Sequence, residues 1–116
     1  MKDLDKYNKI RGLLISELIS EKAFWSYNLE QTEINKIPDD YLIALTLKHL
    51  DLKEIELLKE IFPMSKIKNS WVKYLIPEGH YLFTLNRFLA WYYFDIKNPD
   101  VYLKSMETRR LNQITK

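Results

Sequence analysis

The sequence predicts an all-α protein, a compact bundle of five to six helices in a single domain over residues 1–116. Apolar residues recur at steps of three and four along most of the chain, and the strict alternation of a β-strand is nowhere sustained. Only two glycines and four prolines interrupt the pattern. Hydrophobic residues make up 47% of the chain, which is enough for a packed interior, so we expect folding to need no cofactor or metal.

Local start and stop signals place the first three helices. Leu4 to Ser20 carries one apolar face at helical spacing. Pro38 suits the first turn of a second helix that we expect to reach His49 or Leu50, with the acids at 39 and 40 complementing its positive end. Asp51 starts a third helix, which ends at Pro63. The acid at 54 completes a capping-box pattern with Asp51.

The second half of the chain predicts three further helical segments. Ser65 is the expected N-cap of a helix over 66–76. After a Pro-Glu-Gly turn, residues 80–96 are apolar almost all round, which is typical of a helix central to a fold or buried in an oligomer interface. Asn98 and Pro99 start a last helix, whose polar, basic tail at 109–116 we expect to fray.

Two aromatic clusters are candidate protein-binding residues. Tyr and Trp are enriched where proteins bind one another, and ten apolar side chains on one 17-residue helix exceed what one core-facing stripe needs. For any individual residue an ordinary core position is the more common explanation. The candidate set, with two arginines of the basic tail added, is Phe24, Trp25, Tyr27, Trp91, Tyr92, Tyr93, Arg109 and Arg110.

Residues 39–76 also predict a unit of three helices that resembles a helix-turn-helix. In such proteins the second helix of the motif enters the major groove of DNA and contacts phosphates and base edges. The candidate contacts are Lys66, Asn69, Ser70 and Lys73. The turn lacks its usual glycine and the helix lacks arginine, so an ordinary solvated face explains the same pattern.

Charge is unevenly spread along the chain. Residues 1–62 carry 9 basic and 12 acidic side chains, a net charge of −3, whereas residues 63–116 carry 9 and 4, a net charge of +5. The basic half can attract an acidic partner. Attraction between the two halves within the fold is the alternative, and we favour it slightly.

Catalytic and metal chemistry find no support in the sequence. Cysteine is absent, and neither His49 nor His80 has a ligand-type residue at helical spacing. Asp39 and Asp40 could be paired catalytic carboxylates, but charges that complement a helix N-terminus are far more common. We therefore expect no enzyme activity, no cofactor and no metal. The charged N-terminus and the lack of a long apolar stretch predict a cytoplasmic protein that does not enter the membrane.

Three sequence segments resemble those of a family of small bacterial helical proteins that are encoded beside nucleotidyltransferase-type, abortive-infection toxins. They are FWSYN at 24–28, IPDDYLIALTLKHL at 37–50 and LNRFLAWYYFDIKNPDVYL at 85–103. The resemblance implies an antitoxin-like role in which the chain binds a partner protein, with DNA as a second partner. Our expectation is therefore a non-enzymatic protein-interaction module whose partner is a toxin or a second copy of itself. The alternative is a DNA-binding regulator.

Overall fold

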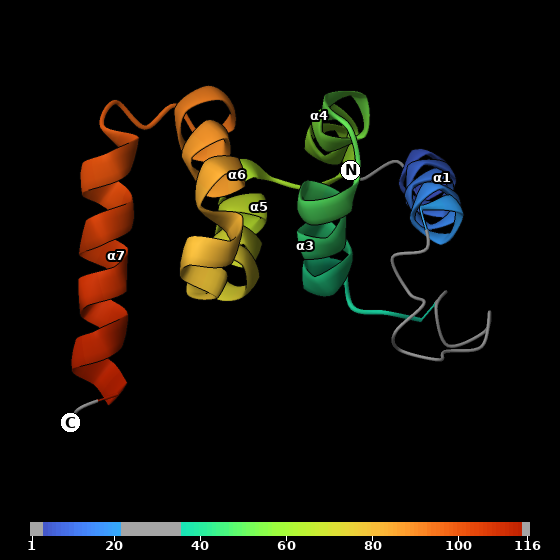
Figure 1. Cartoon of the computed structure of the whole chain (residues 1–116). Coiled ribbons are helices and arrows are strands. Elements are labelled where there is room, and N and C mark those ends of the chain that lie inside the picture. Colours follow the sequence, from blue (N-terminus) through green and yellow to red (C-terminus); the bar gives the residue numbers. More distant parts are fainter. Residues whose placement is uncertain (1–3, 22–35, 115–116) are drawn as a thin grey trace. The chain divides into compact units, whose positions relative to one another are not determined.

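The computed structural model describes residues 4–21 and 36–114, and all the regular structure in these residues is helical (Figure 1). The all-α prediction is confirmed. The described chain divides into two compact units, residues 1–70 and residues 71–116.

The first unit contains four helices in the described residues: α1 (Leu4–Ser20), α3 (Asp39–His49), α4 (Leu52–Ile61) and α5 (Met64–Ser70). α3 packs against each of the other three, and α1 also packs against α4. Six consecutive residues of α3, from Leu42 to Leu47, are buried. An α-helix buried all round its middle is a central helix, so α3 provides the core of this unit.

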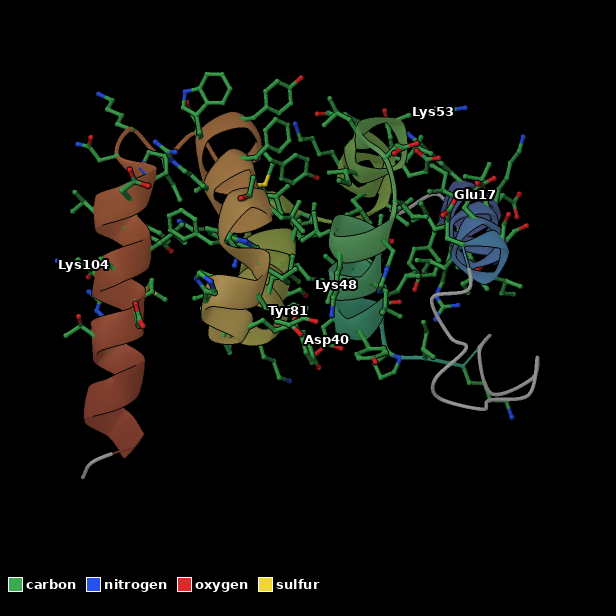
Figure 2. The ribbon with its side chains drawn as sticks, in the orientation of Figure 1. Glu17, Asp40, Lys48, Lys53, Tyr81 and Lys104 are labelled. Atoms are coloured by element: carbon green, nitrogen blue, oxygen red, sulfur yellow. The ribbon has the colours of Figure 1, made fainter. Side chains whose placement is uncertain are left out.

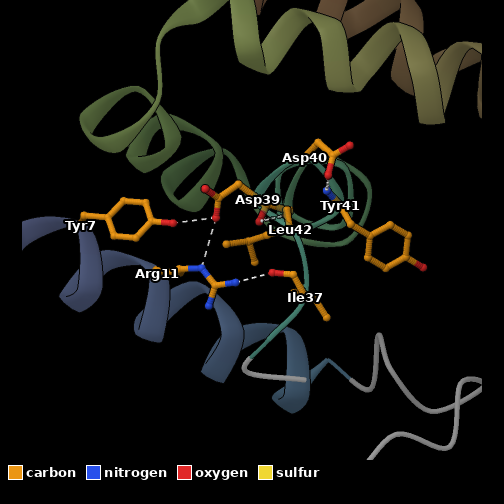
Figure 3. A network of polar contacts seen from close by, with 8 residues as sticks. Tyr7, Arg11, Ile37, Asp39, Asp40, Tyr41 and Leu42 are labelled. Carbon is orange, nitrogen blue, oxygen red and sulfur yellow. Dashed lines mark hydrogen bonds and ion pairs between the residues drawn. The ribbon is translucent and has the colours of Figure 1, made fainter. Parts of the chain in front are cut away.

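The start of α3 is tied to α1 by a polar network (Figure 3). The Tyr7 hydroxyl donates to Asp39 Oδ1 at 2.7 Å, and Arg11 Nε lies 3.3 Å from the same oxygen. A second nitrogen of Arg11 donates to the carbonyl of Ile37. Asp40 Oδ1 accepts from the backbone N–H of Tyr41 at 2.9 Å. Both acids therefore hold the helix start, which agrees with the interpretation of Asp39 and Asp40 as helix-end charges.

Two expectations about α4 and α5 are corrected. Asp51 is the N-cap of α4, but its side chain makes no capping hydrogen bond. The capping box therefore does not form. The backbone carbonyl of Asp51 accepts from the N–H groups of Glu54 and Ile55, which are the first hydrogen bonds of the helix. The next helix begins at Met64 rather than after Ser65, because the Pro63 carbonyl accepts from the N–H groups of residues 66 and 67.

The second unit alternates short segments of different helical type. A π-helical turn, η2 (Trp71–Leu75), is followed by the 3₁₀ segment η3 (Ile76–Leu82), by α6 (Phe83–Phe88), by a second π-helical turn, η4 (Leu89–Tyr93), and by α7 (Pro99–Ile114). α7 packs against η3 and α6. The single helix expected over 80–96 is therefore divided among the end of η3, α6 and η4, and it ends at Tyr93. Gly79 adopts φ 54° and ψ −118° and breaks the helical path before it.

A buried hydrogen-bonded bridge joins η2 to α6. Trp71 is fully buried, and its indole Nε1 donates to Asn86 Oδ1 at 3.0 Å. The amide nitrogen of Asn86 donates in turn to the carbonyl of Leu75 at 3.1 Å. The Trp71 ring stacks on Phe94, with centroids 4.5 Å apart, and on Tyr102, at 5.9 Å. The Trp71 side chain, which belongs to η2, therefore contacts α6, α7 and the residue that follows η4.

The last helix runs on through Ile114, past the point at which fraying is expected to begin. At its other end, Asn98 accepts a backbone hydrogen bond from Tyr102 at 3.0 Å, which agrees with a helix start at Asn98 and Pro99. Fraying of the tail is a statement about motion and stays a prediction, as does the single domain over 1–116.

We expect replacement of Tyr7 by Phe to lower the free energy of unfolding by about 1 kcal/mol at pH 7, because it removes a hydrogen bond to the partly buried carboxylate of Asp39. Burial, and then the hydrogen bond to Asp39, raise the pKa of Tyr7 above its ordinary value of 10.0. The stabilisation is present in full below pH 10 and is lost as the pH rises through the folded-state pKa. Urea unfolding between pH 8 and pH 11 should show the two proteins converging above pH 10. A constant difference across this range would contradict the assignment.

Replacement of Asn86 by Ala should lower the free energy of unfolding by about 3 kcal/mol, because it leaves the buried indole N–H of Trp71 without its partner and removes the hydrogen bond to the carbonyl of Leu75. Replacement of the exposed Asn69 by Ala is the matched control and should change stability by less than about 0.5 kcal/mol. Chemical denaturation measures both. Equal stability of the two variants would mean that the bridge contributes nothing.

Asp95 follows η4 with φ 54°, a left-handed conformation that side chains rarely adopt. Asp95→Gly should therefore raise the free energy of unfolding by about 1 kcal/mol, whereas Asp95→Ala should lower it. Thermal or urea unfolding of the three proteins tests the order. If the Ala variant were as stable as the Gly variant, the backbone strain at this position would be refuted.

Candidate functional site

The most prominent surface feature of the second unit is a cluster of three exposed aromatic side chains, which we call the aromatic surface: Phe88, Trp91 and Tyr92. Their exposed fractions are 40%, 62% and 48%. The rings of Phe88 and Tyr92 are stacked, with centroids 5.4 Å apart and planes 8° from parallel. The Trp91 ring lies 6.3 Å from that of Tyr92. The three side chains therefore form one continuous apolar patch.

Helical spacing explains why these three residues share a face. Residues three and four apart lie on the same side of a helix, and 88, 91 and 92 have this spacing. Asn86, Leu89, Ala90 and Tyr93 follow the same rule on the other side, and all four are buried. The bridge from Asn86 to Trp71 fixes this buried side, and so determines which aromatic residues face outward.

Tyr93 must be removed from the predicted binding residues. It is only 4% exposed, and its ring packs edge-on against Phe94 with centroids 5.0 Å apart. The prediction treated the run from 91 to 93 as one set, although position 93 lies at helical spacing from the buried positions 86, 89 and 90. Trp91 and Tyr92 are exposed as expected.

A shallow depression of about 430 Å³ adjoins the aromatic surface. Thr84, Arg87, Phe88, Trp91 and Pro99 line it. Arg87 Nε lies 3.0 Å from Asp100 Oδ1, so an ion pair connects α6 to the first turn of α7 beside the depression. Both side chains are more than half exposed, and a pair of this kind contributes little to stability. The aromatic surface thus has a polar rim.

The other predicted protein-binding residues do not join this surface. Phe24, Trp25 and Tyr27 lie outside the described residues. Arg109 is exposed on α7, ten residues beyond Pro99 and therefore about 15 Å further along the helix. Arg110 belongs to the same helix. The aromatic surface is therefore made by Phe88, which the prediction missed, together with Trp91 and Tyr92.

The candidate DNA-contacting face is altered by the structure. Lys66, Asn69 and Lys73 are exposed, but Ser70 is only 2% exposed, and its Oγ has no hydrogen-bond partner within the described chain. Ser70 lies three residues after the buried Ile67 and next to the buried Trp71, so helical spacing places it on the inner side. Ser70 cannot contact DNA from this position.

The remaining members of that face are divided between the two units. Lys66 and Asn69 belong to the first unit, and Lys73 lies in η2 of the second. α3 packs against both α4 and α5, so the three-helix arrangement expected from residue 39 onward is present as far as Ser70. DNA binding through Lys66, Asn69 and Lys73 stays a prediction.

Two further features bear on catalysis and membranes. Residues 4–21 and 36–114 contain no group of three His, Asp or Glu side chains that could hold a metal ion. His49, expected at the core or its boundary, is exposed instead, and His80 is exposed as expected. None of the helices in this part of the chain has both the length and the apolar character that crossing a bilayer requires.

Comparison of the chain with models of known protein families, with curated proteins and with solved structures gives no match. The resemblance to proteins encoded beside abortive-infection toxins therefore stays a prediction.

The sequence prediction also missed the role of Asn86. In the sequence it only interrupts an apolar stretch, whereas in the structure it is 2% exposed and holds two hydrogen bonds. The sequence does carry a signal for this role. A single amide in an otherwise apolar helix needs hydrogen-bond partners when it is buried.

Proposed function

We propose that this chain is a non-enzymatic protein-interaction module that binds a partner protein through the aromatic surface of Phe88, Trp91 and Tyr92. The observation that carries the proposal is the ring contact of these three half-exposed side chains on a single stretch of helix. Aromatic rings bury large apolar areas with little loss of conformational freedom, and Trp and Tyr are enriched among the residues that dominate binding energies.

The charge of the second unit indicates the chemistry of the partner. Residues 71–116 carry 7 basic and 4 acidic side chains, a net charge of +3. An apolar patch on a basic unit favours a partner that offers an apolar pocket with acidic side chains around it, because complementary charge speeds association and selects the partner. A toxin neutralised by this chain, as the resemblance implies, is the partner that we propose.

The test is co-expression with the nucleotidyltransferase-type protein that the resemblance implies as a neighbour, followed by measurement of the dissociation constant of the purified pair. Trp91→Ala and Tyr92→Ala should each weaken binding by about 30-fold, which corresponds to the 2 kcal/mol of a binding hot spot. They should also abolish the rescue of growth. Val101→Ala is the matched control, because Val101 is 68% exposed and lines neither the aromatic surface nor the depression beside it. It should leave affinity unchanged.

Two results would overturn the proposal. One is unchanged affinity in both aromatic variants. The other is self-association of the chain alone that the same variants abolish, as measured by sedimentation, because the aromatic surface would then bind a second copy instead of a toxin. Unfolding curves of each variant must match the parent, which the exposure of both side chains leads us to expect.

A further inference from the structure

The second unit also contains a cavity that the proposed function does not use. It has a volume of about 430 Å³ and lies among residues of η3, α6 and α7. This volume is within the range of roughly 300–1,000 Å³ that is typical of small-molecule sites. Gly79 forms part of the wall, and a Cβ atom added there would meet nothing within 4 Å, so the space beside it is open.

The cavity combines an apolar wall with one buried amide. Ile76, Pro77, Phe83 and Leu103 supply apolar side chains, which suit an apolar ligand body. Asn86 supplies the amide, and it is held in place by its hydrogen bonds to Trp71 and Leu75. An Asn side chain has two donor hydrogens and two acceptor lone pairs. These two bonds use one of each, so one N–H and one lone pair of Asn86 have no hydrogen-bond partner among the described residues.

The charged residues of the wall are exposed and mixed in sign. Lys104, labelled on α7 in Figure 2, is accompanied by Asp100 and Glu107, and Asp100 is already paired with Arg87. A rim of this kind exerts no strong attraction on an anion or a cation. The cavity chemistry therefore favours a ligand without net charge.

We infer that this cavity binds a small uncharged molecule that carries a planar amide group on an apolar body. An amide places an acceptor oxygen beside a donor N–H, which is the complement of the N–H and lone pair that Asn86 retains. The ring or chain that bears the amide then lies against Phe83 and Leu103. Because Asn86 is fixed before the ligand arrives, little side-chain ordering opposes binding.

The probe is benzamide, titrated into ¹⁵N-labelled full-length protein and followed by two-dimensional NMR. The side-chain amide of Asn86 and the indole N–H of Trp71 should shift saturably, with a dissociation constant on the order of 1–10 mM for a fragment of this size. The indole N–H of Trp91, on the aromatic surface, should not move. Acetophenone has the same shape but lacks the amide N–H, and it should bind about three- to tenfold more weakly.

Filling the cavity provides the matched variants. Leu103→Trp should weaken benzamide binding by at least tenfold, and Val101→Ala, at a position 68% exposed on the same helix, should leave it unchanged. Glu107→Trp is a second filling variant at an exposed position, for the case in which Leu103→Trp fails to fold. Absence of saturable shifts, equal binding of acetophenone, or undiminished binding in the folded filling variants would each overturn the inference. None of these results depends on whether the aromatic surface binds a partner.

Discussion

The second unit depends on one buried hydrogen-bonded bridge, from the indole of Trp71 through the amide of Asn86 to the carbonyl of Leu75. A π-helical turn ends at Leu75, which is at the same time the N-cap of η3. Because the site is buried, an indole N–H left unpaired there would be costly. Asn86 bonds to the Leu75 carbonyl and the indole N–H together, and in doing so it fixes the rotation of α6 relative to η2.

That rotation determines what the unit shows to solvent. With Asn86 inward, Leu89, Ala90 and Tyr93 follow it into the interior, and Phe88, Trp91 and Tyr92 are left on the outside. The same side chain forms part of the wall of the cavity beside η3 and α7. The aromatic surface and the cavity are thus two consequences of one orientation. A change at Asn86 would therefore alter both.

Helix boundaries were predictable where a local signal exists, and the faces of helices were not predictable where the regular pattern is interrupted. The bounds 4–20 agree with the structure, and the next helix begins at Asp39, one residue after the expected Pro38, which is its N-cap. Periodicity and proline are reliable signals here because they act within a few residues. Phe88 was missed and Tyr93 was wrongly included, because a run of aromatic residues was taken as one set. Ser70 was misplaced because it was grouped with the polar residues around it, although its helical spacing from Ile67 places it on the buried side.

In the first unit, too, one polar side chain orients the helices, and there it is the carboxylate of Asp39. Asp39 was interpreted as a helix-end charge, and it also accepts from the Tyr7 hydroxyl and pairs with Arg11, so it joins α1 to the start of α3. In both units a single polar side chain within an apolar pattern connects segments that are distant in the sequence.

Hydrophobic spacing predicts which segments are helical, but many rotations of those helices would bury similar apolar area. A hydrogen bond is directional, so it selects one rotation among them. The polar residues inside the apolar pattern therefore determine the rotation of these helices more strictly than the apolar residues do.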